Sequence, residues 1–207
     1  MNKVIAAALS LVASAAIAAP PAREAPVWGT PSTPEDLQIL HEFSVCVAER
    51  HPREAEALLA SDFTTEEYND QARRLAQETT KCIPVGRLRF NQVLFAGGMA
   101  EALLRRGHGP LDLAARTAYD PKRPPIQARG ETEMMALCAV RAAPAAVEAL
   151  LATPVASARE TEVEAALGPA IGGCLKAGMT LRLNRPMLRA VLALAAHRLA
   201  ADHGAGR

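Results

Sequence analysis

The sequence predicts an all-α protein made of two copies of one four-helix module, with one disulfide in each copy. An internal repeat with an offset of 92 to 93 residues predicts the duplication, and two equally spaced cysteine pairs predict the disulfides. No stretch alternates apolar and polar residues as a half-buried strand would, and Ala, Leu, Glu and Arg dominate. The elements are therefore expected to be helices.

The repeat consists of several kinds of residue in the same order in both copies. Glu-Ala-Leu-Leu-Ala occurs at 56–60 and again at 148–152, an offset of 92. After one inserted residue, Leu-Arg-Phe-Asn at 88–91 returns as Leu-Arg-Leu-Asn at 181–184. Chance similarity of two Ala-rich segments would not easily place all these matches in order. Four further pairs are 92 residues apart: Cys46 and Cys138, Cys82 and Cys174, Pro52 and Pro144, and Gly86 and Gly178.

The cysteines are expected to form the disulfides Cys46–Cys82 and Cys138–Cys174. Four cysteines allow three pairings, and the duplication favours this one because a single ancestral module could close only on itself. Closing such a loop stabilises a fold by roughly 3 to 4 kcal/mol in the chain-entropy model. No Cys-x-x-Cys pair occurs, so a structural role is favoured over redox chemistry or covalent haem attachment.

Residues 1–18 are predicted to be a secretory signal peptide. They contain Lys3, an apolar run over 4–17 and the small-x-small sequence Ala16-Ile17-Ala18. The run is shorter than the ~20 residues that span a bilayer, which disfavours an uncleaved anchor. A periplasmic or secreted protein without a membrane span after cleavage is expected, with 19–32 as an N-terminal extension outside the fold.

Helix signals recur along both copies. Thr33 and Pro34 start a helix that ends near Arg50, and Pro52 starts a second one. The sequence Thr64-Thr65-Glu66-Glu67 reads as a capping box, with Ser157-Ala158-Arg159-Glu160 as its equivalent, and Asn91 and Asn184 are candidate caps of the last helices. The predicted helices are 34–50, 52–60, 65–81, 92–106 and 185–201.

The copies divide the mature chain into two modules. The first is predicted over 33–106 and the second over 130–202, followed by a tail over 203–207. Residues 107–129 are rich in Gly and Pro and are expected to form a connecting loop, with a short helix at Leu111–Ala118. The Ala-rich helix that ends the second module favours close packing of the two modules.

Charge and composition exclude several classes of partner. The whole chain has 23 basic and 22 acidic residues, and removing residues 1–18 removes Lys3, which leaves a formally neutral protein. A nucleic-acid binder or a binder of anionic membranes needs a net basic surface. The last helix carries Arg185, Arg189 and Arg198 on one predicted polar side, but it lacks the Trp or Phe anchors of interfacial helices. Burial against the rest of the protein is favoured.

The sequence contains no recognisable catalytic or metal site. None of the serines of the folded part lies in a Gly-x-Ser-x-Gly turn, and the acids Glu160, Glu162 and Glu164 are expected to stabilise a helix start. No cofactor is predicted, although Met134 or Met135 facing His197 across a helical unit could ligate a haem. The five histidines lack the i, i+3 or i, i+4 spacing of metal ligands and are expected to be solvated or capping: His41, His51, His108, His197 and His203.

Arg89 and Arg182 are the candidate binding residues, because both copies keep an arginine in the repeated Leu-Arg-apolar-Asn segment. A guanidinium can hold a carboxylate or another anion with two hydrogen bonds. The alternative is a structural role, in which each arginine contacts helix ends or a glutamate of its own module. Retention in both copies favours that alternative.

Together these observations predict an exported, non-enzymatic helical protein that presents a surface to another envelope or extracellular macromolecule, such as an unidentified protein. The alternative is a binder of a small molecule, haem or an anion, or an unrecognised enzyme, using a groove between the modules. A deep pocket lined by Arg89, Arg182 or His197 would favour the alternative, whereas a large exposed apolar patch would favour a partner surface.

Overall fold

The computed structural model describes residues 33–82, 91–106, 111–179 and 181–204, and this part of the chain contains helices and no strands. The predicted all-α class is therefore confirmed. The predicted signal peptide, the N-terminal extension up to residue 32 and Arg89 lie outside the described residues.

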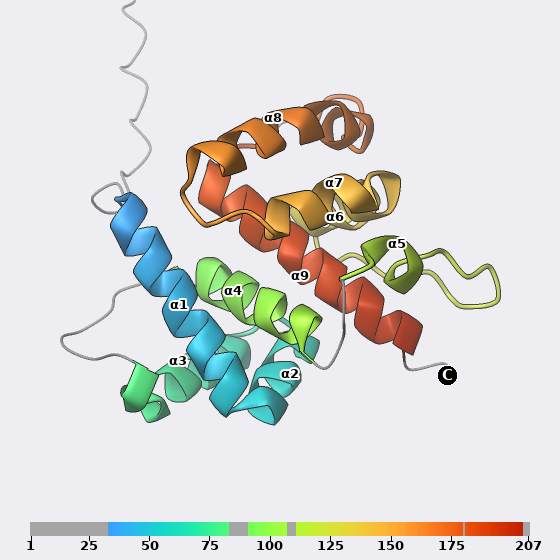
Figure 1. Ribbon diagram of the computed structural model, residues 1–207. Coiled ribbons are helices and arrows are strands. Elements are labelled where there is room, and N and C mark those ends of the chain that lie inside the picture. Colours follow the sequence, from blue (N-terminus) through green and yellow to red (C-terminus); the bar gives the residue numbers. More distant parts are fainter. Residues whose placement is uncertain (1–32, 83–90, 107–110, 180, 205–207) are drawn as a thin grey trace, which may run out of the picture. The chain divides into compact units, whose positions relative to one another are not determined.

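The helices follow one another in two sets joined by a short helix (Figure 1). The first set is α1 (Pro34–Arg50), α2 (Pro52–Ala60), α3 (Glu66–Glu78), the 3₁₀ turn η1 (Thr80–Cys82) and α4 (Gln92–Arg105). The second set is α6 (Glu131–Ala142), α7 (Pro144–Leu151), α8 (Ala158–Gly173) and α9 (Arg185–Gly204). Between them lies α5 (Leu113–Arg116), at the position predicted for a short helix in the connection.

Most predicted caps are present. Thr33 and Asp36 form a reciprocal capping box at the start of α1, and the Asn91 side chain accepts a hydrogen bond from the backbone N–H of Val93 at 2.8 Å. The start of α3 is a correction: Thr65, not Thr64, is its N-cap. The reason is that the backbone and hydroxyl of Thr64 both donate to the side chain of Asp62.

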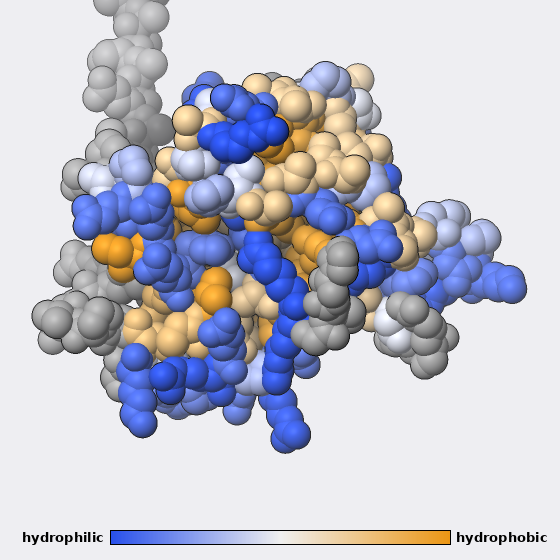
Figure 2. Space-filling model, viewed as in Figure 1, coloured by the Kyte–Doolittle hydropathy of each residue, from blue (hydrophilic) through white to orange (hydrophobic). Residues whose placement is uncertain are grey.

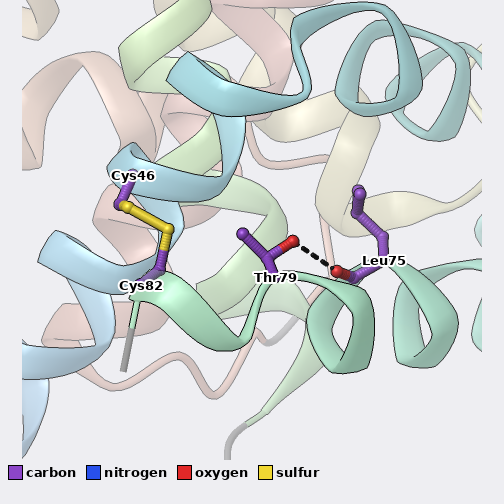
Figure 3. Close-up of a disulfide and its surroundings, with 4 residues drawn as sticks. All are labelled: Cys46, Leu75, Thr79 and Cys82. Atoms are coloured by element: carbon purple, nitrogen blue, oxygen red, sulfur yellow. Dashed lines mark hydrogen bonds between the residues drawn. A yellow bond between two sulfur atoms is a disulfide. The ribbon is translucent and has the colours of Figure 1, made fainter. Parts of the chain in front are cut away.

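Both predicted disulfides are confirmed. Cys46 of α1 is joined to Cys82 just after α3 (Figure 3), and Cys138 of α6 is joined to Cys174 at the end of α8. Beside the first, α3 ends at Glu78 rather than at 81, and the buried Thr79 hydroxyl donates to the carbonyl of Leu75 at 2.7 Å. Two disulfides indicate an oxidising compartment, such as the periplasm or the cell exterior.

α9 runs between the two sets of helices (Figure 1). It packs against α4 of the first set on one side and against α6 and α7 of its own set on the other. Each set has its own cluster of buried apolar side chains, one around Phe43, Phe95 and Met99 and the other around Met135, Leu150 and Leu192. The described residues therefore form one compact unit with two cores.

No described helix is by itself long and apolar enough to cross a membrane. The pair α6 and α7 passes the test of length and composition when taken together, but it is bent by 104° at the break between the helices.

The crossing of α4 and α9 depends on small residues. A Cβ atom on Gly97 would lie 2.6 Å from both the Cα and the Cβ of Ala190. One residue later, a Cβ on Gly98 would lie 2.6 Å from the Cβ of Ser44 in α1. Gly97 and Ala190 are 93 residues apart, which is the offset of the repeated Leu-Arg-apolar-Asn segment.

We expect Gly97→Ala to destabilise the fold by about 1 to 3 kcal/mol, because the added methyl group overpacks against the backbone of α9. The matched control is Gly172→Ala in α8, where nothing lies within 4 Å of the added atom. Because alanine has a higher helix propensity than glycine, this control substitution should stabilise the fold by up to ~1 kcal/mol. Urea unfolding followed by circular dichroism measures both values, and equal effects of the two substitutions would contradict the tight crossing.

Candidate functional site

A cavity of about 300 Å³ lies where the two hydrophobic cores meet. Leu59 of α2 and Leu194 of α9 pack on both cores and also line this space, which we call the apolar cavity. Its walls are mainly apolar, and one of its aromatic side chains, Phe63, is 42% exposed at its edge. The other lining residues are Ser61, Tyr68, Gln92, Val93, Arg129, Thr132, Glu133, Leu183, Met187, Val191, Ala195, His197 and Arg198.

Two titratable side chains that line the apolar cavity, Tyr68 and His197, are neutral at pH 7. Burial raises the pKa of Tyr68 to about 12, so its phenol keeps its proton at neutral pH. Burial, and secondly the charge of Arg116, lower the pKa of His197 to about 4, so the imidazole is uncharged. Within the described part of the chain, neither side chain has a hydrogen-bond partner, so both remain able to bond to a ligand.

The charged residues of the apolar cavity are already occupied. Arg129 donates to the carbonyls of Ala60 and Ser61 at the end of α2, and its guanidinium lies 5.7 Å from the centre of the Phe63 ring. Arg198 forms an ion pair with Glu133. The cavity therefore offers apolar surface and neutral hydrogen-bonding groups rather than a free charge.

A second cavity, of about 220 Å³, lies at the other side of the crossing of α4 and α9 and has different chemistry. We call it the charged cavity, because Glu101 of α4, Glu160 of α8 and Arg189 of α9 line it and are all nearly fully buried. Ala156, which also lines it, adopts the left-handed conformation with φ +59° and donates its N–H to Glu160 at 2.6 Å. The remaining lining residues are Leu37, Leu40, His41, Leu94, Gly98, Val155, Ser157, Thr161, Arg185, Pro186 and Ala190.

Arg189 is the centre of the charged cavity. Its Nε and Nη2 donate to the two carboxylate oxygens of Glu101 at 2.7 and 2.8 Å, and its Nη1 donates to Glu160 at 2.9 Å. The same guanidinium donates to the carbonyls of Leu150 and Leu151 at the end of α7, each at 3.1 Å. The side chain thus satisfies its own donors and closes the end of a helix.

Glu101 is held ionised by its partners. Burial alone would raise the pKa of this carboxyl, but hydrogen bonds from His41 and Arg189, together with their charges, outweigh burial and lower the pKa to about 2. His41 lies 3.2 Å from Glu101 and Arg105 lies 3.4 Å from it. Because every charge here has a partner within the protein, the charged cavity has a clear structural role.

Glu164, one helical turn after Glu160, is the exception. Its side chain is 5% exposed and neither carboxylate oxygen has a hydrogen-bond partner, although Arg185 Nε lies 3.7 Å away. Burial and the charge of Glu160 raise its pKa to about 7, against the opposing charges of Arg185 and Arg189. Part of the Glu164 population is therefore protonated at neutral pH.

Many residues that line the two cavities stand 92 or 93 positions apart in the sequence. Tyr68 of the apolar cavity stands 92 residues before Glu160 of the charged cavity, and Leu194 stands 93 residues after Glu101. The residues paired in this way differ in chemistry. Further pairs at an offset of 92 are Phe63 and Val155, Arg129 and Leu37, Thr132 and Leu40, and Glu133 and His41; at an offset of 93 they are Gln92 and Arg185, Val93 and Pro186, Met187 and Leu94, and Val191 and Gly98.

The structure places the predicted site residues away from both cavities or outside the described part. Arg182 is exposed and lines neither cavity, and Arg89 is not among the described residues. Met135 is fully buried in the second core and lines neither cavity, so it does not face His197 across this space. No group of three or more His, Cys, Asp or Glu side chains among the described residues is placed to hold a metal ion.

Three expectations about polar residues are corrected. Arg189 is not on a polar face of α9 but 4% exposed, because Glu101 and Glu160 compensate its charge inside the protein. Glu164 does not simply stabilise a helix start, since the packing of α8 buries it. His197 is half-buried rather than fully solvated, because α9 is packed on both sides.

Comparisons with known proteins add no relative: no family model, no curated protein and no solved structure matches this chain.

We expect Arg189→Met to destabilise the protein by about 3 to 5 kcal/mol, because it leaves two buried carboxylates without their partner. The control Arg159→Met removes an exposed pair with Glu162 and should change stability by less than ~1 kcal/mol. Denaturant unfolding compares the two. Adding Glu101→Gln to Arg189→Met should recover part of the loss, and a loss unaffected by this second substitution would contradict the charge explanation.

We expect Glu164→Gln to stabilise the protein much more at pH 8 than at pH 5. The folded-state pKa of Glu164 is raised from 4.5 to about 7, so the cost of ionising this buried carboxyl develops as the pH rises from about 4.5 and is complete above about 7. At pH 5 most of this cost is absent. The control Glu162→Gln is exposed and should show no such dependence. Urea unfolding at both pH values tests this, and an equal gain at pH 5 would refute it.

Proposed function

We propose that this protein binds a mainly apolar molecule, or the apolar part of a larger one, in the apolar cavity between its two sets of helices. The observation that supports this best is the partly enclosed, largely apolar space of about 300 Å³ where both cores meet. Binding sites for small molecules are typically concave and apolar, with a few polar groups that orient the ligand. Tyr68 and His197 supply such groups, and both are neutral at pH 7.

The surface of the described residues favours this function over presentation of a broad apolar face to a partner. The exposed large apolar side chains are Ile39, Phe63 and Tyr119, and Phe63 belongs to the cavity. On the face seen in Figure 2, strongly hydrophobic side chains lie in small areas among hydrophilic ones. His197 lines the apolar cavity. From the sequence, a pocket lined by this histidine is expected to favour a ligand site over a partner surface.

We also propose that the chain is a tandem duplication whose two four-helix modules, 33–106 and 130–202, pack against each other through α4 and α9. Both disulfides enclose 36 residues, and helices of the same order surround each one. Gly97 and Ala190, which occupy equivalent positions of the repeat, meet at the crossing. Matching positions also line the apolar and the charged cavity, as expected if the copies are related by an approximate two-fold rotation.

The proposed location is the periplasm or the cell exterior, reached through cleavage of a signal peptide over residues 1–18. The basic residue Lys3, the apolar run after it and the Ala16-Ile17-Ala18 sequence support export. The two disulfides agree with that destination.

We expect Met187→Trp to weaken binding of the neutral fluorophore N-phenyl-1-naphthylamine by at least about tenfold, because the larger side chain fills the apolar cavity. The matched control is Leu94→Trp, 93 residues before Met187. This substitution places the tryptophan at the charged cavity instead and should leave binding of the fluorophore unchanged. Fluorescence titration of exported, oxidised protein measures both. Failure of the unmodified protein to bind the fluorophore, or equal binding by both variants, would overturn the proposal.

A further inference from the structure

A larger, more open cavity of about 820 Å³ adjoins the apolar cavity along α9. Leu59, His197 and Arg198 line both spaces, so the two spaces meet at these side chains. The second space, which we call the outer cavity, is also lined by Arg116 of α5 and by Ala201 near the end of α9.

We propose that the apolar and outer cavities together hold one ligand, a long-chain carboxylate, with its chain in the apolar cavity and its carboxylate beside Arg116. This inference rests on the proposed function, since it names the class of molecule that the apolar cavity would take. The bound molecule would thus have a charged end, and that end would lie beside Arg116.

Arg116 is the group that selects the charge of this end. Its Nη1 donates to the carbonyls of Leu104 at 2.6 Å and Leu111 at 3.4 Å, and no carboxylate of the described residues forms an ion pair with it. A guanidinium has five N–H donors, and two of them fit a carboxylate side by side. Arg116 is half-buried. Burial lowers the pKa of its guanidinium, and the charge of Asp112 raises that pKa to a smaller extent. A bound anion beside Arg116 would therefore stabilise its positive charge.

The other charges of the outer cavity compete little for this anion. Asp202 pairs with Arg123 at 3.4 Å, and Arg198 pairs with Glu133. Glu56 also lines the outer cavity but is exposed to solvent, where water screens its charge. Arg116 is thus the cation of this cavity that lacks a carboxylate partner among the described residues.

His197 lies at the junction and fits the same ligand. It lines the outer cavity together with Arg116, whose charge contributes to the lowered pKa of the imidazole. A neutral imidazole has one N–H to donate, so His197 could bond to the same carboxylate.

The length of the combined space favours a long chain. Met187 lines the apolar cavity and Ala201 lines the outer cavity, and both belong to α9. At a rise of ~1.5 Å per residue, the helix between them is about 21 Å long. A ligand that reaches from one end of the combined space to the other therefore needs a long chain, whereas a short acid would fill only one end.

The test compares a sixteen-carbon fatty acid with the alcohol of the same chain length, below their micelle-forming concentrations at pH 8, by displacement of the fluorophore. We expect the unmodified protein to bind the acid about tenfold more tightly than the alcohol, and Arg116→Gln to abolish this preference. Arg116→Lys should restore part of it. The control Arg182→Gln removes an exposed charge outside both cavities and should behave like the unmodified protein.

The neutral alcohol separates the possible failures. Unchanged binding of the alcohol shows that Arg116→Gln is folded with an intact apolar cavity. Equal affinities for acid and alcohol in the unmodified protein, or a preference that survives Arg116→Gln, would overturn the carboxylate inference and leave the proposed function standing. Binding of neither compound, together with no binding of the fluorophore, would overturn both.

Discussion

The buried guanidinium of Arg189 is the interaction on which the arrangement of helices depends. It belongs to α9, yet its partners are Glu101 of α4, Glu160 of α8 and two carbonyls at the end of α7. Taking such a group out of water is costly, and the cost is offset only when its hydrogen bonds are all made in good geometry. One orientation of α9 meets this condition, so the charge fixes how the two sets of helices sit against each other.

Close packing at the crossing of α4 and α9 places the cavities on either side of it. Gly97 and Ala190 bring the two backbones together, and larger side chains farther along each helix cannot approach as closely. One of the resulting spaces is filled by the electrostatic network of Arg189. The other is left with apolar walls, Tyr68 and His197, so the same geometry supports stability on one side and offers room for a ligand on the other.

Local features of the fold could be predicted from the sequence, whereas the candidate site could not. The cap at Thr33 and the helix start at Pro52 depend on neighbouring residues, and the cysteine spacing together with the repeat was enough to pair the disulfides. The burial of Arg189 was missed because its partners, Glu101 and Glu160, are distant in the chain, so the sequence of the last helix alone favoured a polar, exposed side for this arginine. The 92 to 93-residue offset holds the missing signal: it pairs Glu160 with Tyr68, a core position, and Glu101 with Leu194.

The proposed duplication would explain why the two cavities pair positions at one offset but differ in chemistry. If both copies began alike, each side of the crossing offered the same set of positions, and a charge introduced on one side needed partners only there. Glu101, Glu160 and Arg189 meet that need together, because the guanidinium pairs with both carboxylates. On the opposite side, the Tyr68 and His197 side chains have no hydrogen-bond partner among the described residues, so they are the groups that the proposed function assigns to a ligand.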